Sequence, residues 1–199
     1  MLSRRFLLAS ATAGLAVCAA RPAFALGGKT GVSSALIGRA LGALQKHQTS
    51  IEHRDVIAIA DFAQPSSARR FHLLDVASGS VTSYLVAHGR GSDPAHTGWL
   101  ERFSNQPSSN ATSAGTFRTE GFYVGAHGRS IRLAGLDATN NNAEPRGIVV
   151  HGAWYVSDAM AREHGVLGRS QGCFALAENC LNEIFAKLGP GRMIYADKV

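Results

Sequence analysis

The fold class is decided by the stretch VIAIADFAQPSSARRFHLLDVASGSVTSYLVA, residues 56–87. It contains three apolar, partly β-branched runs, at 56–62, 70–76 and 81–87, a composition typical of β-strands. The second and third runs are separated by the four residues Ala-Ser-Gly-Ser, which are typical of a hairpin connection. The stretch therefore predicts neighbouring strands of one sheet.

Four more strands are expected further along the chain, at 121–125, 130–136, 148–151 and 192–196. Residues 89–120 are rich in Gly, Ser, Asn, Pro and Thr and show little periodicity. Because this segment is too long for a passive connection in a compact domain, we expect a functional loop region. The sequence contains no internal repeat or linker, so it predicts one mainly β domain with a few helices.

Two amphipathic helices are expected to accompany the strands. Apolar residues recur at helical spacing over 34–47 and again over 177–188. A shorter helical stretch at 160–163 is expected to end at Gly165, since glycine is a common C-cap. Cys180 falls on the apolar face of the segment 177–188, which predicts that it is a core residue.

The N-terminal residues 1–25 have the three parts of an export signal. Arg4 and Arg5 form a basic start, residues 6–20 are apolar, and residues 23–25 read Ala-Phe-Ala, a typical cleavage site. The arginine pair also fits the twin-arginine export route. The apolar run is too short for a stable membrane span. We therefore predict an exported protein of the periplasm or cell envelope, with no stable membrane span after cleavage.

Cleavage of the signal changes the size and charge of the chain. It would leave 174 of the 199 residues, enough for one domain with a core. Removing Arg4, Arg5 and Arg21 from the 20 basic residues leaves 17, against 14 acidic residues. Since no Lys/Arg run alternates with aromatic residues, we expect no nucleic-acid partner. The predicted parts are the signal at 1–25, an N-terminal helical segment at 26–54 and the main domain at 55–199.

The cysteines point to a free thiol. Cys18 would leave with the signal, and a bridge between Cys173 and Cys180 would close only a small loop. Cys180 is explained more simply as a core residue than as a disulfide partner. Cys173, in GRSQGCFAL (168–176), is then either a small buried residue or a nucleophile.

A nucleophilic thiol needs a base, and four His-Gly pairs offer one. His127 lies in an expected hairpin turn and His164 at an expected helix end, where both are ordinary. His88 and His151 each end a strand. We favour His151, because strand 148–151 anchors it and the Cys173 turn follows in the same part of the chain.

His151-Gly152, followed after seventeen residues by Ser170-Gln171-Gly172-Cys173, resembles the signature of the L,D-transpeptidase (YkuD-like) catalytic domain of bacterial cell-wall enzymes. The segment 168–176 is most similar to the murein L,D-transpeptidase branch, where it reads GRSxGCPAL. The resemblance covers about residues 55–196 and implies a β-sandwich or barrel-like catalytic fold.

The chain departs from the family pattern at three positions. Gln171 stands where the broader family has His, which leaves His151 as the base. Ala175 replaces the usual Arg or Asn, so the residue that holds the loop or a substrate carboxylate is open. Phe174 replaces the Pro of the nearer branch, which we interpret as a packing difference.

The resemblance implies roles for individual residues. Cys173 would be the nucleophile, His151 its base, and the carbonyl of Gly152 would orient the imidazole. Gly172 would let the backbone pass close to the substrate, and the amides of Gly172 and Cys173 would face the oxyanion. The candidate substrate-binding residues are Arg169, Ser170, His88 and Tyr155. Arg169 would bind a substrate carboxylate or else a structural acid, and Ser170 would contact the substrate or else stabilise the turn. His88 would contact the substrate or else lie behind the site, and Tyr155 would line the cleft or else lie in the core with Trp154.

The implied substrate is the peptide stem of peptidoglycan. The acyl group would pass to another diaminopimelate, giving a 3→3 cross-link, to a free D-amino acid, or to water. Carbapenems would acylate the same thiol, and no cofactor or metal is implied. Three alternatives stay open: a cell-wall carboxypeptidase or amidase with the same Cys-His pair, a non-catalytic wall-binding protein, and a metal site. The candidate metal ligands are His88, His151, His164 and Cys173.

Overall fold

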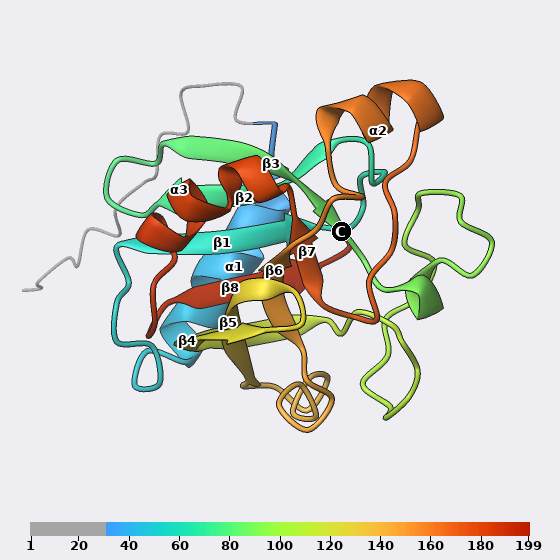
Figure 1. The fold of residues 1–199 in the computed structure, drawn as a ribbon. Coiled ribbons are helices and arrows are strands. Elements are labelled where there is room, and N and C mark those ends of the chain that lie inside the picture. Colours follow the sequence, from blue (N-terminus) through green and yellow to red (C-terminus); the bar gives the residue numbers. More distant parts are fainter. Residues whose placement is uncertain (1–30) are drawn as a thin grey trace, which may run out of the picture.

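The structure of the protein is a computed structural model that describes residues 31–199 (Figure 1). The predicted export signal, including Arg4, Arg5 and Cys18, lies outside the described residues. Within residues 31–199, no helix combines the length and the apolar character needed to cross a membrane.

Eight strands form a closed barrel, which confirms the prediction of a mainly β, barrel-like fold (Figure 1). The strand order around the barrel is β1-β2-β3-β7-β6-β5-β4-β8. In chain order the elements are α1 (Ser34–Lys46), β1 (Val56–Asp61), β2 (Arg69–Asp75), β3 (Val81–Ala87), the 3₁₀ helix η1 (Arg90–Ser92), β4 (Gly115–Gly125), β5 (Gly128–Gly135), β6 (Val149–Gly152), α2 (Asp158–His164), β7 (Phe174–Leu176), the 3₁₀ helix η2 (Glu178–Cys180), α3 (Leu181–Lys187) and β8 (Met193–Asp197).

Two pairs of neighbouring strands in the barrel are parallel, and we call each such parallel pairing a seam. The other pairings are antiparallel. β1 pairs in parallel with β8, the last strand, and this seam closes the barrel. β6 pairs in parallel with β7. Parallel neighbours need a long crossover connection, and residues 153–173 supply it between β6 and β7. This connection contains α2 and ends in the turn that carries Cys173.

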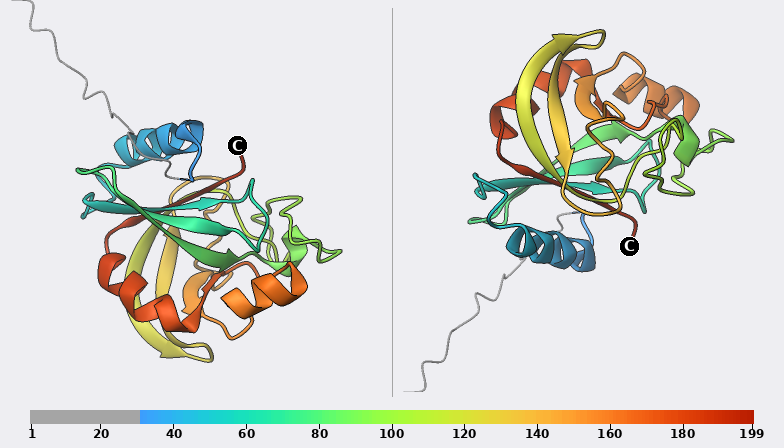
Figure 2. Two further views of the ribbon diagram at one scale, coloured as in Figure 1. Left: turned by 90° about the horizontal axis from the view of Figure 1, so that it is seen from above. Right: turned by 90° about the horizontal axis from the view of Figure 1, so that it is seen from below.

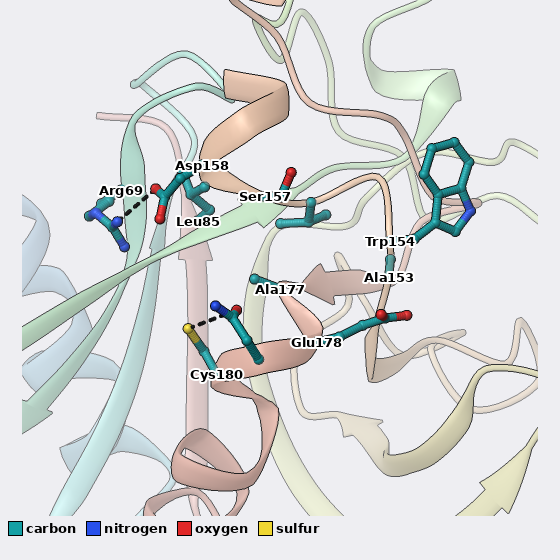
Figure 3. Close-up of a pocket in the computed structure, with 11 residues that line it drawn as sticks. Arg69, Leu85, Ala153, Trp154, Ser157, Asp158, Ala177, Glu178 and Cys180 are labelled. Atoms are coloured by element: carbon teal, nitrogen blue, oxygen red, sulfur yellow. Dashed lines mark hydrogen bonds and ion pairs between the residues drawn. The ribbon is translucent and has the colours of Figure 1, made fainter. Parts of the chain in front are cut away.

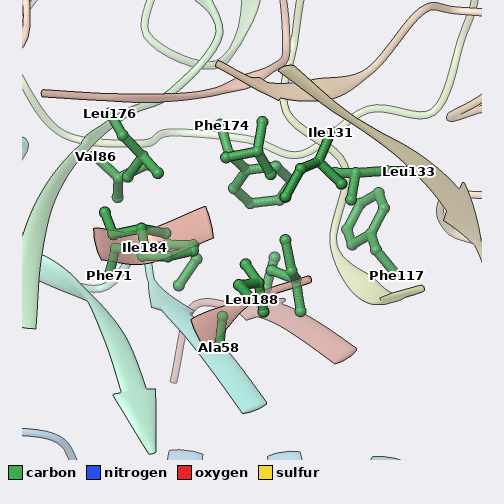
Figure 4. Packing of buried hydrophobic residues seen from close by; sticks show 14 of the residues in the cluster. Ala58, Phe71, Val86, Phe117, Ile131, Leu133, Phe174, Leu176, Ile184 and Leu188 are labelled. Carbon is green, nitrogen blue, oxygen red and sulfur yellow. The ribbon is translucent and has the colours of Figure 1, made fainter. Parts of the chain in front are cut away.

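The barrel interior is filled by apolar side chains from the strands and from α3 (Figure 4). Phe174, next to Cys173, is fully buried there and meets Phe117 edge-on, with ring centroids 5.3 Å apart. Ile184 and Leu188, from α3 and its C-cap, belong to the same cluster. The residue that follows Cys173 is therefore fixed in the core, which limits movement of the turn.

Helix α1 packs on the outside of the barrel. Its buried face belongs to a second apolar cluster that includes Ile57 and Ile59 of β1 and Met193 of β8. Figure 2 shows α1 on one side of the barrel and α2 and α3 on the opposite side. The predicted helix over 34–47 is confirmed, and its buried residues Leu36, Ile37, Ala40 and Leu44 follow helical spacing.

Two sequence predictions about elements were wrong. Residues 115–120, assigned to the long loop, form the first half of β4, which pairs with both β5 and β8. Their many polar residues hid this strand, although Thr116, Phe117 and Thr119 are buried. The helix expected over 177–188 starts instead as η2, and only 181–187 is α-helical.

Cys180 lies at the junction of η2 and α3 and is only half-buried. It packs against the edges of two apolar clusters, and its thiol lies 3.4 Å from Oδ1 of Asn179. Both Cys180 and Cys173 are free thiols. The residue is therefore at the margin of the core, not at its centre as the helical pattern predicted.

Candidate active site

Parallel pairing of β6 with β7 brings the predicted base and nucleophile together. His151 lies opposite Ala175 in this ladder. Cys173 comes two residues before Ala175, and residues two apart along a strand direction face the same side. His151 and Cys173 both line one cleft of about 440 Å³. Its other lining residues are Tyr123, Ala126, His127, Arg146, Gly147, Val149, Tyr155, Arg169, Ser170 and Gln171.

The imidazole of His151 is buried and held in one tautomer. Its Nδ1 lies 2.9 Å from the carbonyl oxygen of Gly152. A carbonyl oxygen only accepts hydrogen bonds, so Nδ1 carries the proton and donates it. This leaves Nε2 with a free lone pair, as a general base requires. The contact is the one that the resemblance implied for Gly152.

His127 stacks on His151, a contact that the sequence did not predict. The two rings are 4.2 Å apart between centroids and inclined by 20°. Burial lowers the pKa of His151, the bond to Gly152 raises it, and the charge of His127 lowers it. His127 lies in the turn between β4 and β5, as expected, but that turn folds over the cleft.

Replacing His127 by Phe is expected to raise the pKa of His151. The substitution keeps an aromatic ring in the stack but removes the positive charge that opposes protonation of His151. His151 would then start to lose its free lone pair at a higher pH than in the wild-type protein. An NMR titration of the His151 ring protons measures this. An unchanged or lower pKa would show that the charge of His127 does not act on His151.

The surroundings of the Cys173 thiol favour its protonated form. Burial raises the pKa of Cys173, while the backbone N–H of Val149 and the charge of Arg146 lower it. The Sγ atom lies 3.6 Å from the carbonyl oxygen of Gly147, a weak S–H···O contact. A thiol in this state needs a base to remove its proton as it reacts, rather than a preformed thiolate.

Arg146 is the second residue that the sequence analysis missed. Its guanidinium donates to the carbonyl oxygens of Ser104 (2.9 Å) and Ala111 (2.5 Å) and to the hydroxyls of Ser113 (2.7 Å) and Ser109 (3.2 Å). All four partners are neutral. The positive charge of Arg146 is therefore not cancelled by an acid among these partners, and it acts on Cys173 across the cleft.

Ser170 stabilises the turn that carries Cys173. Its hydroxyl donates to the carbonyl oxygen of Cys173 (2.7 Å) and accepts from the N–H of Gly172 (3.1 Å). The Gly172 amide is thus engaged within the turn, and its role as an oxyanion donor stays a prediction. Gly172 has φ +116°, and a Cβ there would lie 2.7 Å from the carbonyl oxygen of Ala111. This packing and the positive φ require glycine at the position.

His88 belongs to a buried network, which corrects its assignment as a substrate-binding residue. Arg70 donates to Nδ1 of His88 (2.7 Å), so Nε2 carries the ring proton and donates to Asp93 (3.3 Å). Burial, followed by the charge of Arg70, lowers the pKa of His88 to about 4. The backbone carbonyl of His88 accepts from the N–H of Ser170 (2.9 Å). The residue supports the Cys173 turn from behind.

Arg169 and Tyr155 do line the cleft. Arg169 donates to the backbone carbonyls of Asp93 and Pro94, not to a structural acid. Burial and the nearby Cys173 raise the pKa of Tyr155 to about 12, so its hydroxyl remains a donor. The core alternative was wrong for Trp154, which follows the end of β6 and is 75% exposed.

Gln171 marks the edge between two cavities. It is exposed, and it lines both the Cys173 cleft and a neighbouring cavity of about 490 Å³. Arg146 lines both as well, and loop residues Pro107, Ser108 and Asn110 form the far wall of the second cavity. The loop region 89–120 therefore contributes to the surroundings of the turn.

The four residues considered as metal ligands do not all meet. His151 and Cys173 line the cleft, whereas His88 is buried behind it and His164 is not among the lining residues. In the part of the chain that the structure describes, no group of three or more His, Cys, Asp or Glu side chains is arranged to hold a metal ion.

The family model for the L,D-transpeptidase catalytic domain matches residues 28–196, which include the cleft and all of the barrel except Asp197, the last residue of β8. The chain belongs to this family. The family assignment agrees with the resemblance first seen in the His151 and Cys173 segments. None of the curated proteins matches the chain.

Several solved structures are similar to this L,D-transpeptidase domain. One is an L,D-transpeptidase from Mycobacterium smegmatis, 15% identical, covering 72% of this chain and 58% of that chain, with a TM-score of 0.44. Another is L,D-transpeptidase 3 from Mycobacterium tuberculosis in complex with a faropenem-derived adduct. It is 13% identical, the match covers 72% of this chain and 60% of that chain, and the TM-score is 0.45. A third is the helical cell shape determining protein Pgp2 from Campylobacter jejuni. It is 11% identical, the match covers 74% of this chain and 48% of that chain, and the TM-score is 0.48. The match spans less than two thirds of each of these chains.

Proposed function

We propose that this protein is an exported cysteine transpeptidase that acts on the stem peptides of peptidoglycan. The family assignment supports the class of enzyme. The observation that carries the proposal is the shared cleft, in which Cys173 accompanies a His151 whose Nδ1–H is tied to Gly152. Because burial raises the pKa of the Cys173 thiol, the reaction needs the free Nε2 of His151 as a base.

In the first step, Nε2 of His151 takes the proton of the Cys173 thiol as Sγ attacks a carbonyl carbon. That carbonyl belongs to the L-centre of a diaminopimelate residue. When the tetrahedral intermediate collapses, the C–N bond breaks and the leaving amine of the terminal D-Ala takes the proton back from His151. The product is a thioester on Cys173.

In the second step, an acceptor amine attacks the thioester carbonyl and loses a proton to His151. The C–S bond breaks, and the Cys173 sulfur recovers its proton from His151. Attack by a second diaminopimelate would give a 3→3 cross-link, and attack by a free D-amino acid would give exchange. Water in place of the amine would make the enzyme a carboxypeptidase.

Other groups in the cleft stabilise the negative charge that develops during these steps. The uncancelled positive charge of Arg146 favours negative charge on the Cys173 sulfur. The amide of Cys173 and the protonated hydroxyl of Tyr155 are the donors that we assign to the developing oxyanion. Arg169 remains the candidate for a substrate carboxylate, since it lines the cleft and its guanidinium donates to backbone carbonyls of Asp93 and Pro94.

Product analysis tests this function. Purified protein is incubated with tetrapeptide-containing muropeptides, and the products are separated and identified by mass spectrometry. We expect dimers joined 3→3, or stems with an exchanged terminal D-amino acid, with the Cys173→Ala protein as the control. Stems shortened by hydrolysis alone would favour the carboxypeptidase alternative. Release of whole stems from the glycan would identify an amidase, and the absence of any product would favour a wall-binding role.

Export is the remaining part of the proposal. It rests on the signal-like residues 1–25, which lie outside the described part of the chain. The substrate also requires it, because peptidoglycan lies outside the cytoplasm. Cell fractionation of the tagged full chain, with the pair Arg4-Arg5 replaced by Lys-Lys, tests the location and the twin-arginine route together.

A further inference from the structure

A second pocket lies behind the segment that follows β6, and the mechanism above does not use it. It has a volume of about 280 Å³, and none of its lining residues also lines the Cys173 cleft. Ala153, Trp154 and residues 156–158 line one side, and residues 177–180 line another (Figure 3). This volume is at the lower end for small-molecule sites, so the pocket suits one ring rather than an extended chain.

The rim of this pocket carries the most exposed tryptophan of the described chain. Trp154 is 75% exposed, and its ring meets the ring of Tyr155 in a T-shaped contact, with centroids 5.8 Å apart and an angle of 81°. An indole is a large apolar surface with one polar N–H group, and such residues are enriched where a ligand covers the apolar part. Its open face suits the C–H face of a pyranose ring, which is flat and apolar while its hydroxyl groups point outward.

The polar groups of the pocket suit a neutral ligand that is rich in hydroxyl groups. Arg69 and Asp158 pair with each other at 2.7 Å on the side opposite Trp154 (Figure 3). Their charges cancel, which disfavours a strongly anionic ligand. Glu178 adds a carboxylate and Asn179 an amide, and both can form hydrogen bonds with the hydroxyl and acetamido groups of a sugar.

The pocket is close to the catalytic cleft along the chain. Trp154 lines the pocket and Tyr155 lines the cleft, and consecutive Cα atoms are about 3.8 Å apart. A glycan-linked stem peptide carries a sugar at one end and the bond to be cleaved only a few residues away. Such a stem spans about 3.3–3.6 Å per residue when extended. Because neighbouring residues line the two places, we infer that one substrate extends from the cleft to the pocket.

We propose that this pocket is a subsite for one sugar ring of the peptidoglycan glycan, occupied while the attached stem peptide lies in the Cys173 cleft. The proposal rests on the proposed function, because it names a further part of the same substrate. Trp154 stacks on the ring, and Glu178 accepts hydrogen bonds from its hydroxyl groups. The subsite makes glycan-linked stems better substrates than free peptides.

The test compares two substrates that differ only in the sugar: a free stem tetrapeptide and the same tetrapeptide linked to its disaccharide. In Trp154→Ala, we expect the ratio of kcat/KM values, glycan-linked over free, to fall about tenfold, a loss typical of one stacking contact. Glu178→Gln, which keeps the side-chain volume, is expected to lower the ratio in the same direction. The matched control is Trp99→Ala, since Trp99 is also exposed but lines neither pocket.

Binding gives a second readout that does not depend on catalysis. In a Cys173→Ala background, Trp154→Ala is expected to reduce cosedimentation with purified sacculi, and Trp99→Ala is not. An unchanged ratio and unchanged binding in Trp154→Ala would overturn the subsite. An equal loss on both substrates would also overturn it, by assigning the pocket to the peptide. A wild-type protein that is inactive on both substrates but binds sacculi through Trp154 would overturn the proposed function and leave the subsite.

Discussion

Replacing Cys173 by Ala is expected to abolish covalent acylation of the protein by a carbapenem. The wild-type chain should gain the mass of one carbapenem, because the strained lactam carbonyl reacts with the thiol as a substrate carbonyl does. Intact-protein mass spectrometry measures the gain, and peptide mapping should place it on Cys173. Turnover of stem peptides should fall by about 10³-fold or more, since Cys173 is the one described cysteine that lines the cleft with His151.

The other described cysteine provides a matched control for this result. Cys180 is also a free thiol, but it does not line the cleft that contains His151. Cys180→Ser should therefore acylate like the wild-type protein. His151→Ala should slow acylation by about 10²–10⁴-fold, the usual contribution of a general base. An adduct on Cys180, or no adduct on the wild-type chain, would remove Cys173 as the nucleophile.

Replacing Arg70 by Met is expected to give a large loss of stability. Arg70 is fully buried on β2 and donates to the carbonyl oxygens of Val86 and Gln64 and to Nδ1 of His88. Burial lowers the pKa of Arg70 to about 9, while the charges of Asp61 and Asp93 oppose that shift. Without the guanidinium, its buried acceptors lose their donor and Asp93 loses a nearby positive charge. We expect the free energy of unfolding to fall by about 3–5 kcal/mol.

Chemical denaturation monitored by circular dichroism measures this loss. Arg39→Met is the matched control, because Arg39 is 55% exposed and its ion pair with Asp197 lies at the surface. A surface pair contributes about 0–1 kcal/mol, so the control should remain close to the wild-type stability. If Arg70→Met unfolds no more easily than Arg39→Met, the buried network does not stabilise the fold.

The sequence predicted the parts of the site that depend on neighbouring residues. Cys173 lies in a short glycine-containing turn, and His151 ends an apolar strand, so each was visible from its own surroundings. The strands at 56–61 and 81–87 were visible for the same reason, since both are rich in apolar and β-branched residues. Local pattern was sufficient where one segment determines its own conformation.

The sequence did not predict contacts made across the barrel. His127 meets His151 because the β4–β5 turn folds over β6. Arg146 is held by hydrogen bonds to hydroxyl and carbonyl oxygens that lie 33 to 42 positions earlier in the chain. No spacing within one segment encodes such contacts. His88 resembled a site residue because it precedes a glycine at a strand end, but the buried Arg70 that binds it lies on another strand.

The parallel seam between β1 and β8 has a consequence for folding. It pairs Ile57 with Met193, so the first and last strands must meet before the barrel is closed. Contacts between such distant positions form slowly, because the chain must lose the entropy of a long loop first. Until β8 arrives, β1 and β4 each expose an unpaired edge, which is prone to aggregation. The arrival of one short strand, β8, therefore pairs both edges and closes the barrel.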